Sequence, residues 1–560
     1  MRVPALPAFM FLAVAAGCAA QTARLPEVVD RTLGNGVKVL MVERPGTGAV
    51  RAGLFLMGGR AATGALPPGA ADLLAYSLFR RLPAPSLGRD LEVTLRQEAA
   101  AFEDLRLERL RQRRPDHTAS PELTSLQTMH AEALKTIQAR LAPTEAWDEV
   151  DALGGTRRAV DVTADYLAFG VDLPAANLPG WLRLEAEHLA APSLCRFPLE
   201  RERLLQALDA GEPPVAASLS VLLSMALAGR AYAQASEFQR GDLEAITLAQ
   251  LGDLARAQLV PARMLLVLAG DLEAATLTPV LERTFGRIKG GPAPEAPPYR
   301  DDNPSSALES PAGRKLQVST SGETRVIFGW RVPRSNHPDG PALQALAQVL
   351  AGSPSARLIQ GLVTTRGLAR KLTLDVGVPG ERDVNLFVIN AEPAPGHALG
   401  ELEQAIEGEI LRLQREPLAE VEVRWAQNQL ETRQILLQED GAALVQALGA
   451  SHCQSGDWRT AFRAFSGERA LRATDIQAAA RTYLVPARMT VALFGPDPLL
   501  QPMDRIEARL LQALTVLVQR RLEDPVAAQR ILREAIRQLR MLSPSEREQT
   551  LKLLEAQVAP

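Results

Sequence analysis

The feature that most constrains the fold of this chain is an internal repeat. The hexapeptide Leu-Val-Pro-Ala-Arg-Met occupies residues 259–264 and again residues 484–489. Each copy follows a stretch of helical character and precedes an apolar run that ends at a glycine, over 265–270 and 490–495. Because proline stops a helix and glycine closes a strand, both copies predict the same helix–turn–strand unit. The chain is therefore predicted to contain two homologous halves.

Composition is that of an ordinary soluble globular protein. Apolar residues make up 46% and charged residues 23% of the 560 residues, and a chain of this length exceeds one typical core. The net charge of −3 is nearly neutral for this size, which argues against nucleic acid as a main partner. Strand and helix patterns mix in both halves, so the predicted fold class is α+β, with two α/β-sandwich domains in tandem.

Turn and linker signals set the predicted domain boundaries. The Asn-Gly pair at 35–36 opens a hairpin in a first domain over residues 28–291. A stretch rich in proline and small polar residues predicts a linker over 292–315. The second domain is predicted over 316–500, with its first strand at 326–332.

Two segments lie outside the duplication. Residues 87–141 are highly charged, carry leucines at helical spacing, and predict a projecting helical hairpin inserted in the first domain. Residues 501–560 predict a helical C-terminal extension, since the motif Ser-Pro-Ser-Glu at 543–546 has the form of a capping box.

The N-terminus has the pattern of an export signal. Residues 1–17 combine an apolar run of signal-peptide length with small residues before Cys18, and Ala-Ala-Gly-Cys resembles a bacterial lipobox. The resemblance implies cleavage before Cys18, a lipid on its sulfur and a tether over 18–27, whereas the alternative is a cleaved signal with an incidental cysteine. Ala19 is not the aspartate associated with inner-membrane retention. We therefore expect a periplasm-facing lipoprotein of the cell envelope, with the outer membrane preferred.

The remaining cysteines predict no covalent framework. Cys195 and Cys453 are far apart in sequence and in no metal-ligand spacing, so two isolated buried thiols are expected. The six histidines never fall within five residues of one another, and neither a Gly-x-Ser-x-Gly elbow nor a glycine-rich phosphate loop is present in the sequence.

Several motifs between residues 28 and 496, outside the insert, resemble the M16 (insulinase, or pitrilysin-like) metallopeptidase family of the two-domain bacterial type. Residues 32–39 look like its opening strand pair, and residues 161–166 are similar to the strand after its active helix. The active-helix pattern of the family is Gly-x-x-His-x-x-Glu-His-x-x-Phe. The residues that stand in this pattern are Gly69, Asp72, Ala75, Tyr76 and Phe79.

The resemblance also locates the other positions of an M16 site. Residues 200–207 look like the helix that supplies the third zinc ligand, and Ala207 stands at that ligand's place. Active members carry an arginine and a tyrosine, seven residues apart, that help hold the substrate. Val363 and Arg370 stand at those two places.

The resemblance implies a catalytically degenerate member of the family. A catalytic zinc ion needs three protein ligands and an open position for water, and alanine at positions 75 and 207 supplies neither a base nor a ligand. Loss of the general base alone removes about 10²–10⁴-fold in rate. We therefore expect zinc to be lost, with no other cofactor and no catalytic or metal-binding residue, although enzymatic activity itself is left open.

Three functional hypotheses are consistent with the sequence. The first is a non-catalytic M16 homologue that serves as a structural or substrate-binding partner of an active M16 subunit. The alternative is a stand-alone periplasmic protein, alone or as a dimer with itself, that binds unfolded peptides or acts as a scaffold. An active metalloendopeptidase is the last. The expected membrane contact is the N-terminal lipid.

Overall fold

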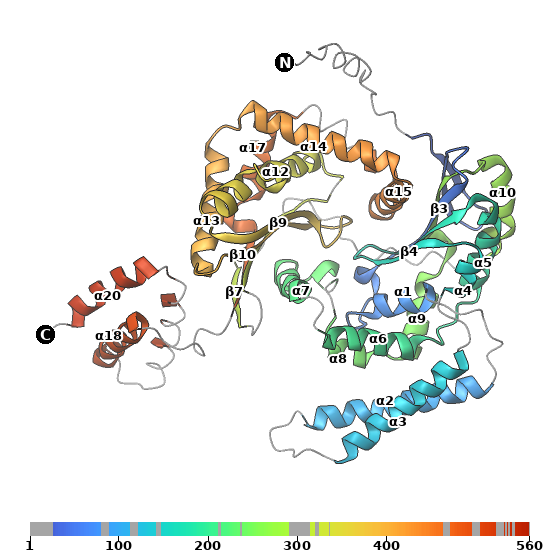
Figure 1. Cartoon of the computed structure of the whole chain (residues 1–560), viewed down its shortest axis with the longest axis horizontal. Coiled ribbons are helices and arrows are strands. Elements are labelled where there is room, and N and C mark those ends of the chain that lie inside the picture. Colours follow the sequence, from blue (N-terminus) through green and yellow to red (C-terminus); the bar gives the residue numbers. More distant parts are fainter. Residues whose placement is uncertain are drawn as a thin grey trace, which may run out of the picture.

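The computed structural model describes residues 26–558, apart from 80–88, 113–120, 142–146, 211–213, 290–313, 320–323, 463–470, 496–504, 522–530 and single or paired residues at 234, 236–237, 335, 533–534, 536–537, 540–541 and 543. The described chain is a mixed α+β fold with two sheets, which confirms the predicted fold class (Figure 1). The predicted signal segment 1–17, Cys18 and nearly all of the tether and linker lie outside the described residues.

The first sheet has the strand order β1-β2-β6-β3-β5-β4. Only β2 and β6 run parallel, and the other neighbours are antiparallel. The predicted hairpin joins β1 to β2, and Gly36 takes a φ of 99° in its turn, which suits a residue without a Cβ. The strands are β1 (Val29–Thr32), β2 (Lys38–Glu43), β3 (Ala49–Met57), β4 (Thr156–Val162), β5 (Tyr166–Pro174) and β6 (Met264–Gly270).

The second sheet has the order β7-β11-β8-β10-β9, again with one parallel pair, β7 and β11. Without β1, the first sheet has the same arrangement of parallel and antiparallel neighbours, so the structure confirms the duplication. The strands are β7 (Arg314–Ser319), β8 (Arg325–Val332), β9 (Ala369–Val378), β10 (Asn385–Pro393) and β11 (Met489–Gly495).

The prediction that β8 is the first strand of the second half was wrong. β7 precedes it and begins inside the predicted linker. Its side chains alternate between half-buried and exposed, and its sequence Arg-Lys-Leu-Gln-Val-Ser has only two apolar residues. An edge strand of this kind gives little hydrophobic signal, so the sequence did not reveal it.

Helices of the first half cover one face of the first sheet. The repeated hexapeptide forms a short turn between a helix and a strand in both halves, as predicted: α9, Pro261–Arg263 and β6 in one, and α17, Pro486–Arg488 and β11 in the other. The helices of the first half are α1 (Ala70–Phe79), α2 (Arg89–Gln112), α3 (Pro121–Leu141), α4 (Asp148–Ala152), α5 (Leu178–Ala190), α6 (Phe197–Asp209), α7 (Pro214–Ala226), α8 (Arg240–Ala245), α9 (Leu248–Gln258) and α10 (Ala274–Arg283).

The second half and the C-terminal extension are likewise helix-rich. In the second half the helices are α12 (Gly340–Ala351), the π-helix η6 (Ile359–Thr365), α13 (Leu399–Arg415), α14 (Glu420–Glu439), α15 (Gly441–Ser455) and α17 (Ala473–Tyr483). The described helices of the extension, α18 (Arg505–Arg521) and α20 (Pro544–Val558), pack on each other. Among the helices that the structure describes, none combines the length and apolar character needed to cross a bilayer.

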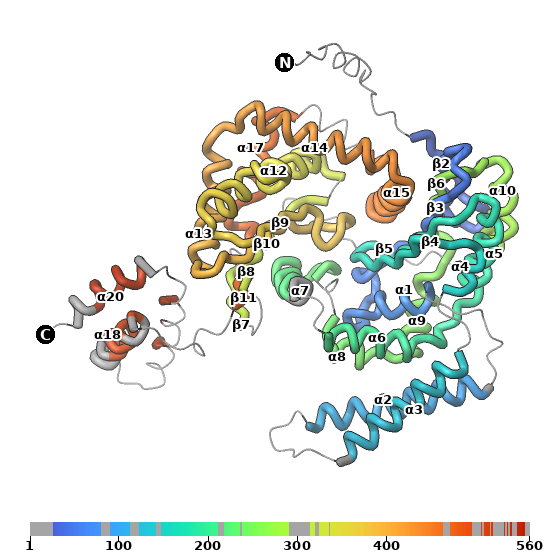
Figure 2. The backbone as a smooth tube through the Cα atoms, viewed as in Figure 1, coloured from blue at the N-terminus to red at the C-terminus, as the bar shows by residue number. Residues whose placement is uncertain are grey.

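The two halves exchange one helix each. α15 of the second half packs on β3 and β6 of the first sheet, and α7 of the first half packs on β8 and β11 of the second (Figure 2). Apolar side chains of α15 such as Leu444 and Leu448 share one buried cluster with Phe55 and Leu265 of the first sheet. Since each sheet is covered on one face by the other half, the described halves form one packed unit.

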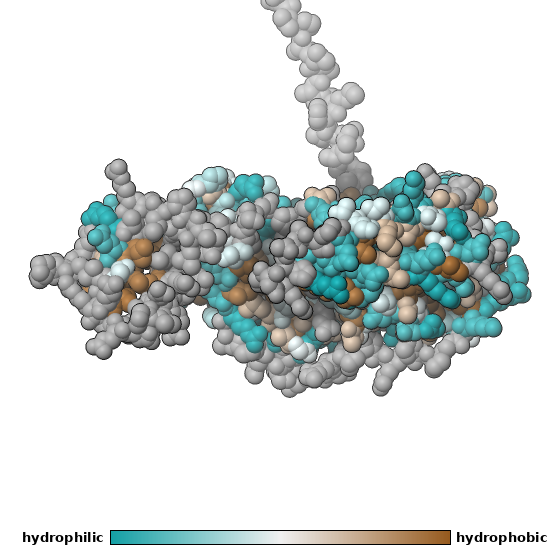
Figure 3. All heavy atoms as spheres, turned by 90° about the horizontal axis from the view of Figure 1, so that it is seen from below, coloured by the Kyte–Doolittle hydropathy of each residue, from teal (hydrophilic) through white to brown (hydrophobic). Residues whose placement is uncertain are grey.

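The insert is a helical hairpin of α2 and α3, as predicted, and it lies along the lower side in Figure 1. A buried ion cluster attaches it to α6. Arg201 Nη2 on α6 lies 2.6 Å from Glu98 Oε1 on α2, and His130 Nε2 on α3 lies 3.1 Å from the same oxygen. The Arg201 guanidinium also lies 3.3 Å from the ring centre of Phe102. Hydrophilic residues dominate much of the described surface seen from this side (Figure 3).

Candidate functional site

The helix α1 carries three of the predicted catalytic positions, and all of its residues except Tyr76 are buried. Gly69 precedes it with a φ of 91°, and a Cβ there would lie 2.7–2.9 Å from Leu243 and Phe238. Glycine therefore allows the close approach that seats α1 in the first core. The resemblance in sequence thus corresponds to a helix in the expected place, beside α6.

The carboxylate of Asp72 forms a two-pronged ion pair with Arg60. Arg60 Nη2 lies 2.7 Å from Asp72 Oδ1, and Arg60 Nε lies 3.0 Å from Asp72 Oδ2. The Asp72 side chain is 4% exposed and that of Arg60 is 23% exposed. A guanidinium in this fork geometry satisfies both carboxylate oxygens of Asp72.

A tight turn positions Arg60. Gly59 has a φ of 55°, and a Cβ on it would lie 2.4–2.5 Å from backbone atoms of Thr163 and Ala164. The backbone N–H of Arg60 donates to the carbonyl of Thr163 at 2.8 Å, and that of Ala61 donates to the carbonyl of Ala164 at 2.9 Å. The β4–β5 turn therefore holds the loop that carries Arg60 over α1.

A second arginine lies over the aromatic side chain of Tyr76 on α1. The guanidinium of Arg203, on α6, is 4.4 Å from the ring centre of Tyr76. Arg203 Nε also lies 2.8 Å from Glu200 Oε2, and Arg196 Nε lies 3.3 Å from Glu200 Oε1. Glu200 is buried, so its charge is balanced inside the protein by these two arginines.

The donor set at this place does not fit a zinc ion. Ala75 and Ala207 offer no ligand atom, and the Asp72 carboxylate is already engaged by a cation. Within the described part of the chain, three or more histidine, cysteine, aspartate or glutamate side chains nowhere gather in an arrangement that could hold a metal ion. The chemistry of this site is that of arginine–carboxylate and arginine–aromatic contacts.

The other two predicted positions lie in the second half. Val363 on η6 packs against the second core, and Arg370 on β9 forms an ion pair with the buried Glu392 at 2.5 Å. Both side chains are therefore engaged within their own half.

The sequence reasoning missed a buried polar junction that connects the α1 loop region to the second half. Asp165, in the β4–β5 turn, accepts hydrogen bonds from the Tyr232 hydroxyl at 2.5 Å and from the Glu381 backbone N–H at 2.8 Å. Burial raises the pKa of Asp165, although these bonds and Arg382 act in the opposite direction. Arg230 adds an ion pair with Asp383 at 2.7 Å.

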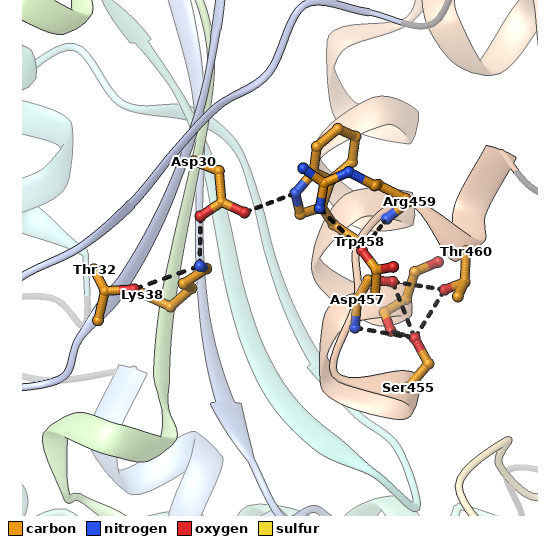
Figure 4. A network of polar contacts seen from close by, with 9 residues as sticks. Asp30, Thr32, Lys38, Ser455, Asp457, Trp458, Arg459 and Thr460 are labelled. Carbon is orange, nitrogen blue, oxygen red and sulfur yellow. Dashed lines mark hydrogen bonds and ion pairs between the residues drawn. The ribbon is translucent and has the colours of Figure 1, made fainter.

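A second polar contact joins the halves at the β1–β2 hairpin (Figure 4). The indole N–H of Trp458 donates to Asp30 Oδ2 at 3.0 Å, and Lys38 forms an ion pair with the same carboxylate. Burial alone would raise the pKa of Asp30, but the bonds from Lys38 and Trp458 hold that pKa below its ordinary value. Nothing in the local sequence around either partner predicts this pairing across the chain.

Comparison with known proteins agrees with this architecture. Residues 245–430 match the family model described as the Peptidase M16 inactive domain. An uncharacterized zinc protease of Mycobacterium leprae is 26% identical over 221 residues, which are 39% of this chain and 47% of that protein. The chain spans about half the length of the curated relatives that it matches.

Solved structures show the same fold at low sequence identity. A protease from Helicobacter pylori has a TM-score of 0.67 and 18% identity, over 84% of this chain and 100% of that one. A peptidase M16 inactive domain from Pseudomonas fluorescens has a TM-score of 0.62 and 17% identity, over 84% of this chain and 98% of that one. The chain therefore has a peptidase-type fold. The likeness to the M16 family is thus one of fold over most of the chain and of sequence over residues 245–430, which match the model of the M16 inactive domain.

Proposed function

We propose that this chain is a non-catalytic M16 homologue that acts by contact, as a structural or substrate-binding partner of an active M16 subunit. The observation that carries the proposal is the pair of arginines at the former catalytic helix. Arg60 engages Asp72 and Arg203 covers Tyr76, so positive charge from the protein stands where the family's pattern calls for a metal ion.

The exchanged helices and the two polar junctions support a contact role. A subunit that acts by contact needs its two halves to be held in a fixed arrangement. Here each sheet is covered by a helix of the other half, and Asp165 and Asp30 add polar bonds between the halves. Removal of the catalytic groups leaves this framework intact.

The place of action that we propose is the periplasmic side of the cell envelope, with a lipid on Cys18 and the outer membrane preferred. Cys18→Ala is expected to move the chain from the membrane fraction to the soluble fraction, as read by immunoblotting. An unchanged distribution would show that the chain is not held through this residue.

Purification of the full-length protein from native membranes, followed by mass spectrometry, tests the partnership. We expect an M16 chain that retains the complete zinc motif to co-purify, and its chelator-sensitive cleavage of peptides to change when this chain is removed. A preparation without such a subunit, together with unchanged cleavage, would contradict the proposal. In that case a stable homodimer in light scattering would favour a stand-alone scaffold.

A further inference from the structure

A groove at the edge of the first half is lined by three arginines. It lies between α5 and α10, extends to the short turn η5 (Phe285–Arg287) and has a volume of about 540 Å³. The two helices lie side by side at the edge of the molecule in Figure 1. Arg183 comes from α5, Arg283 from α10 and Arg287 from η5. All three side chains are exposed, so their charges are open to a ligand.

The three guanidinium groups are not neutralised by the protein. Within the described part of the chain, none of them forms an ion pair, a hydrogen bond or a ring contact. The carboxylate of Glu187 lines the same groove and forms no ion pair with a described residue either. Three positive groups and one negative group leave a net charge of +2, which favours an anion. The planar fork of an arginine matches the oxygens of a phosphate group.

Most of the remaining lining is apolar. It consists of side chains from both helices and from the residue after η5: Pro179, Ala186, Ala190, Val280 and Ile288. A small inorganic anion would contact the arginines and leave these side chains uncovered. An anion that carries an apolar body contacts both parts of the lining, as ligands of mixed sites do.

The groove lies next to the N-terminal strand pair. Asn35, in the β1–β2 turn, donates through Nδ2 to the carbonyls of Phe285 and Ile288 at 2.8 and 3.0 Å. Residues 19–28 separate Cys18 from β1, and an extended chain of that length spans at most about 40 Å. A lipid on Cys18 therefore brings this part of the first half within reach of a membrane surface.

We propose that the groove binds the headgroup of an anionic phospholipid. The three arginines hold the phosphate oxygens, and the apolar side chains contact the glycerol and the first methylene groups of the lipid. A choline headgroup is disfavoured, because its ammonium group is repelled by the arginines. The inference rests on the membrane placement proposed above, but its test does not require the lipid anchor.

Vesicle flotation of the full-length Cys18→Ala chain tests the proposal. Vesicles of phosphatidylcholine are compared with an equal mixture of phosphatidylcholine and phosphatidylglycerol. A basic side chain at an anionic surface contributes about fivefold in affinity, so a net charge of +2 predicts about 10–100-fold tighter binding to the mixture. Added salt should reduce this preference, since it screens the charges. Equal binding to the two kinds of vesicle, or no binding, would overturn the proposal.

Two variants assign the groups. The triple change Arg183→Gln/Arg283→Gln/Arg287→Gln is expected to abolish the preference for anionic vesicles. Glu187→Gln removes the opposing charge and is expected to increase the affinity for them about fivefold. Circular dichroism checks that both variants are folded. A folded triple variant with an unchanged preference would refute the assignment, as would a Glu187→Gln chain that binds like its parent.

The matched control is Arg415→Gln/Arg424→Gln/Arg433→Gln. It removes the same charge from exposed positions on α13 and α14, outside the groove. We expect this variant to bind anionic vesicles like its parent. A loss as large as that of the groove variant would show that overall charge, and not the groove, determines the binding.

Titration with glycerol 3-phosphate separates a lipid from a soluble anion of the same chemistry. We expect it to bind at least about tenfold more weakly than anionic vesicles, because it leaves the methylene contacts of the lipid unmade. Tight binding that displaces the chain from vesicles would overturn the assignment to a lipid. The fractionation of Cys18→Ala cells tests the anchor separately from all of these measurements.

Discussion

Replacement of Arg60 by methionine is the perturbation that most directly probes the ion pair on helix α1. The variant leaves Asp72, whose side chain is 4% exposed, without the cation that binds both of its oxygens. Breaking a buried ion pair by removing one partner costs about 3–5 kcal/mol. Because the Arg60 side chain is 23% exposed and water reaches this edge of the pair, we expect a smaller cost than for a fully buried pair, about 2–3 kcal/mol.

Calorimetric unfolding measures this effect. Because the two halves form one packed unit, its unfolding entropy is large, and the loss corresponds to a decrease in Tm of about 2–3 °C. Asp72→Asn is expected to cost less, about 1 kcal/mol, because the guanidinium left behind can be hydrated. The double variant Arg60→Met/Asp72→Leu removes both charges and is expected to recover most of the loss, since apolar replacement of a buried pair is often neutral.

The double-mutant cycle decides whether the two residues act as a pair. Residues in direct contact show interaction energies of about 0.5–3 kcal/mol. If the two single changes add without an interaction energy, or if Arg60→Met leaves Tm unchanged, the argument that Arg60 holds the buried charge of Asp72 is refuted.

Three further predictions concern other buried groups. Arg201→Met removes a positive charge from the buried Glu98 carboxylate, so it is expected to lower the free energy of unfolding by about 3–5 kcal/mol and to speed hydrogen exchange in α2 and α3. Arg106→Met, at a surface ion pair, is the control and should change the free energy of unfolding by less than about 1 kcal/mol. Burial raises the pKa of the Cys453 thiol, so a thiol reagent is expected to modify it only in denaturant; rapid modification of the native protein would contradict its burial. Burial also raises the pKa of Asp165, so the folded state holds that proton more tightly than the unfolded state and stability is lost as pH rises from the unfolded to the folded pKa. Urea midpoints measured from about pH 4 to about pH 7 should therefore fall more steeply for the wild type than for Asp165→Asn, and parallel curves would count against a raised pKa.

Local sequence signals were sufficient for much of the fold. The repeated hexapeptide predicts the same helix–turn–strand unit in each half, and the Asn-Gly pair predicts the first hairpin, because each signal depends on a few neighbouring residues. The charged segment 87–141 likewise predicts the helices of the insert. By contrast, the edge strand β7 has too few apolar residues to be distinguished from a linker.

The features that connect distant parts of the chain were not predictable in this way. The exchange of α7 and α15 depends on how the two halves dock, and the apolar face of a helix does not indicate which sheet it packs against. Similarly, the sequence places alanine and aspartate on α1 but gives no sign that Arg60 closes on Asp72. That contact depends on the Gly59 turn and its bonds to the β4–β5 turn.

Metal content is the measurement that tests the central claim most directly. Freshly purified full-length protein is expected to contain far less than one zinc ion per chain by mass spectrometry, before and after incubation with zinc and desalting. Its peptide cleavage, if any, should be indifferent to chelators. One zinc ion per chain, lost together with proteolysis on chelation, would contradict the account.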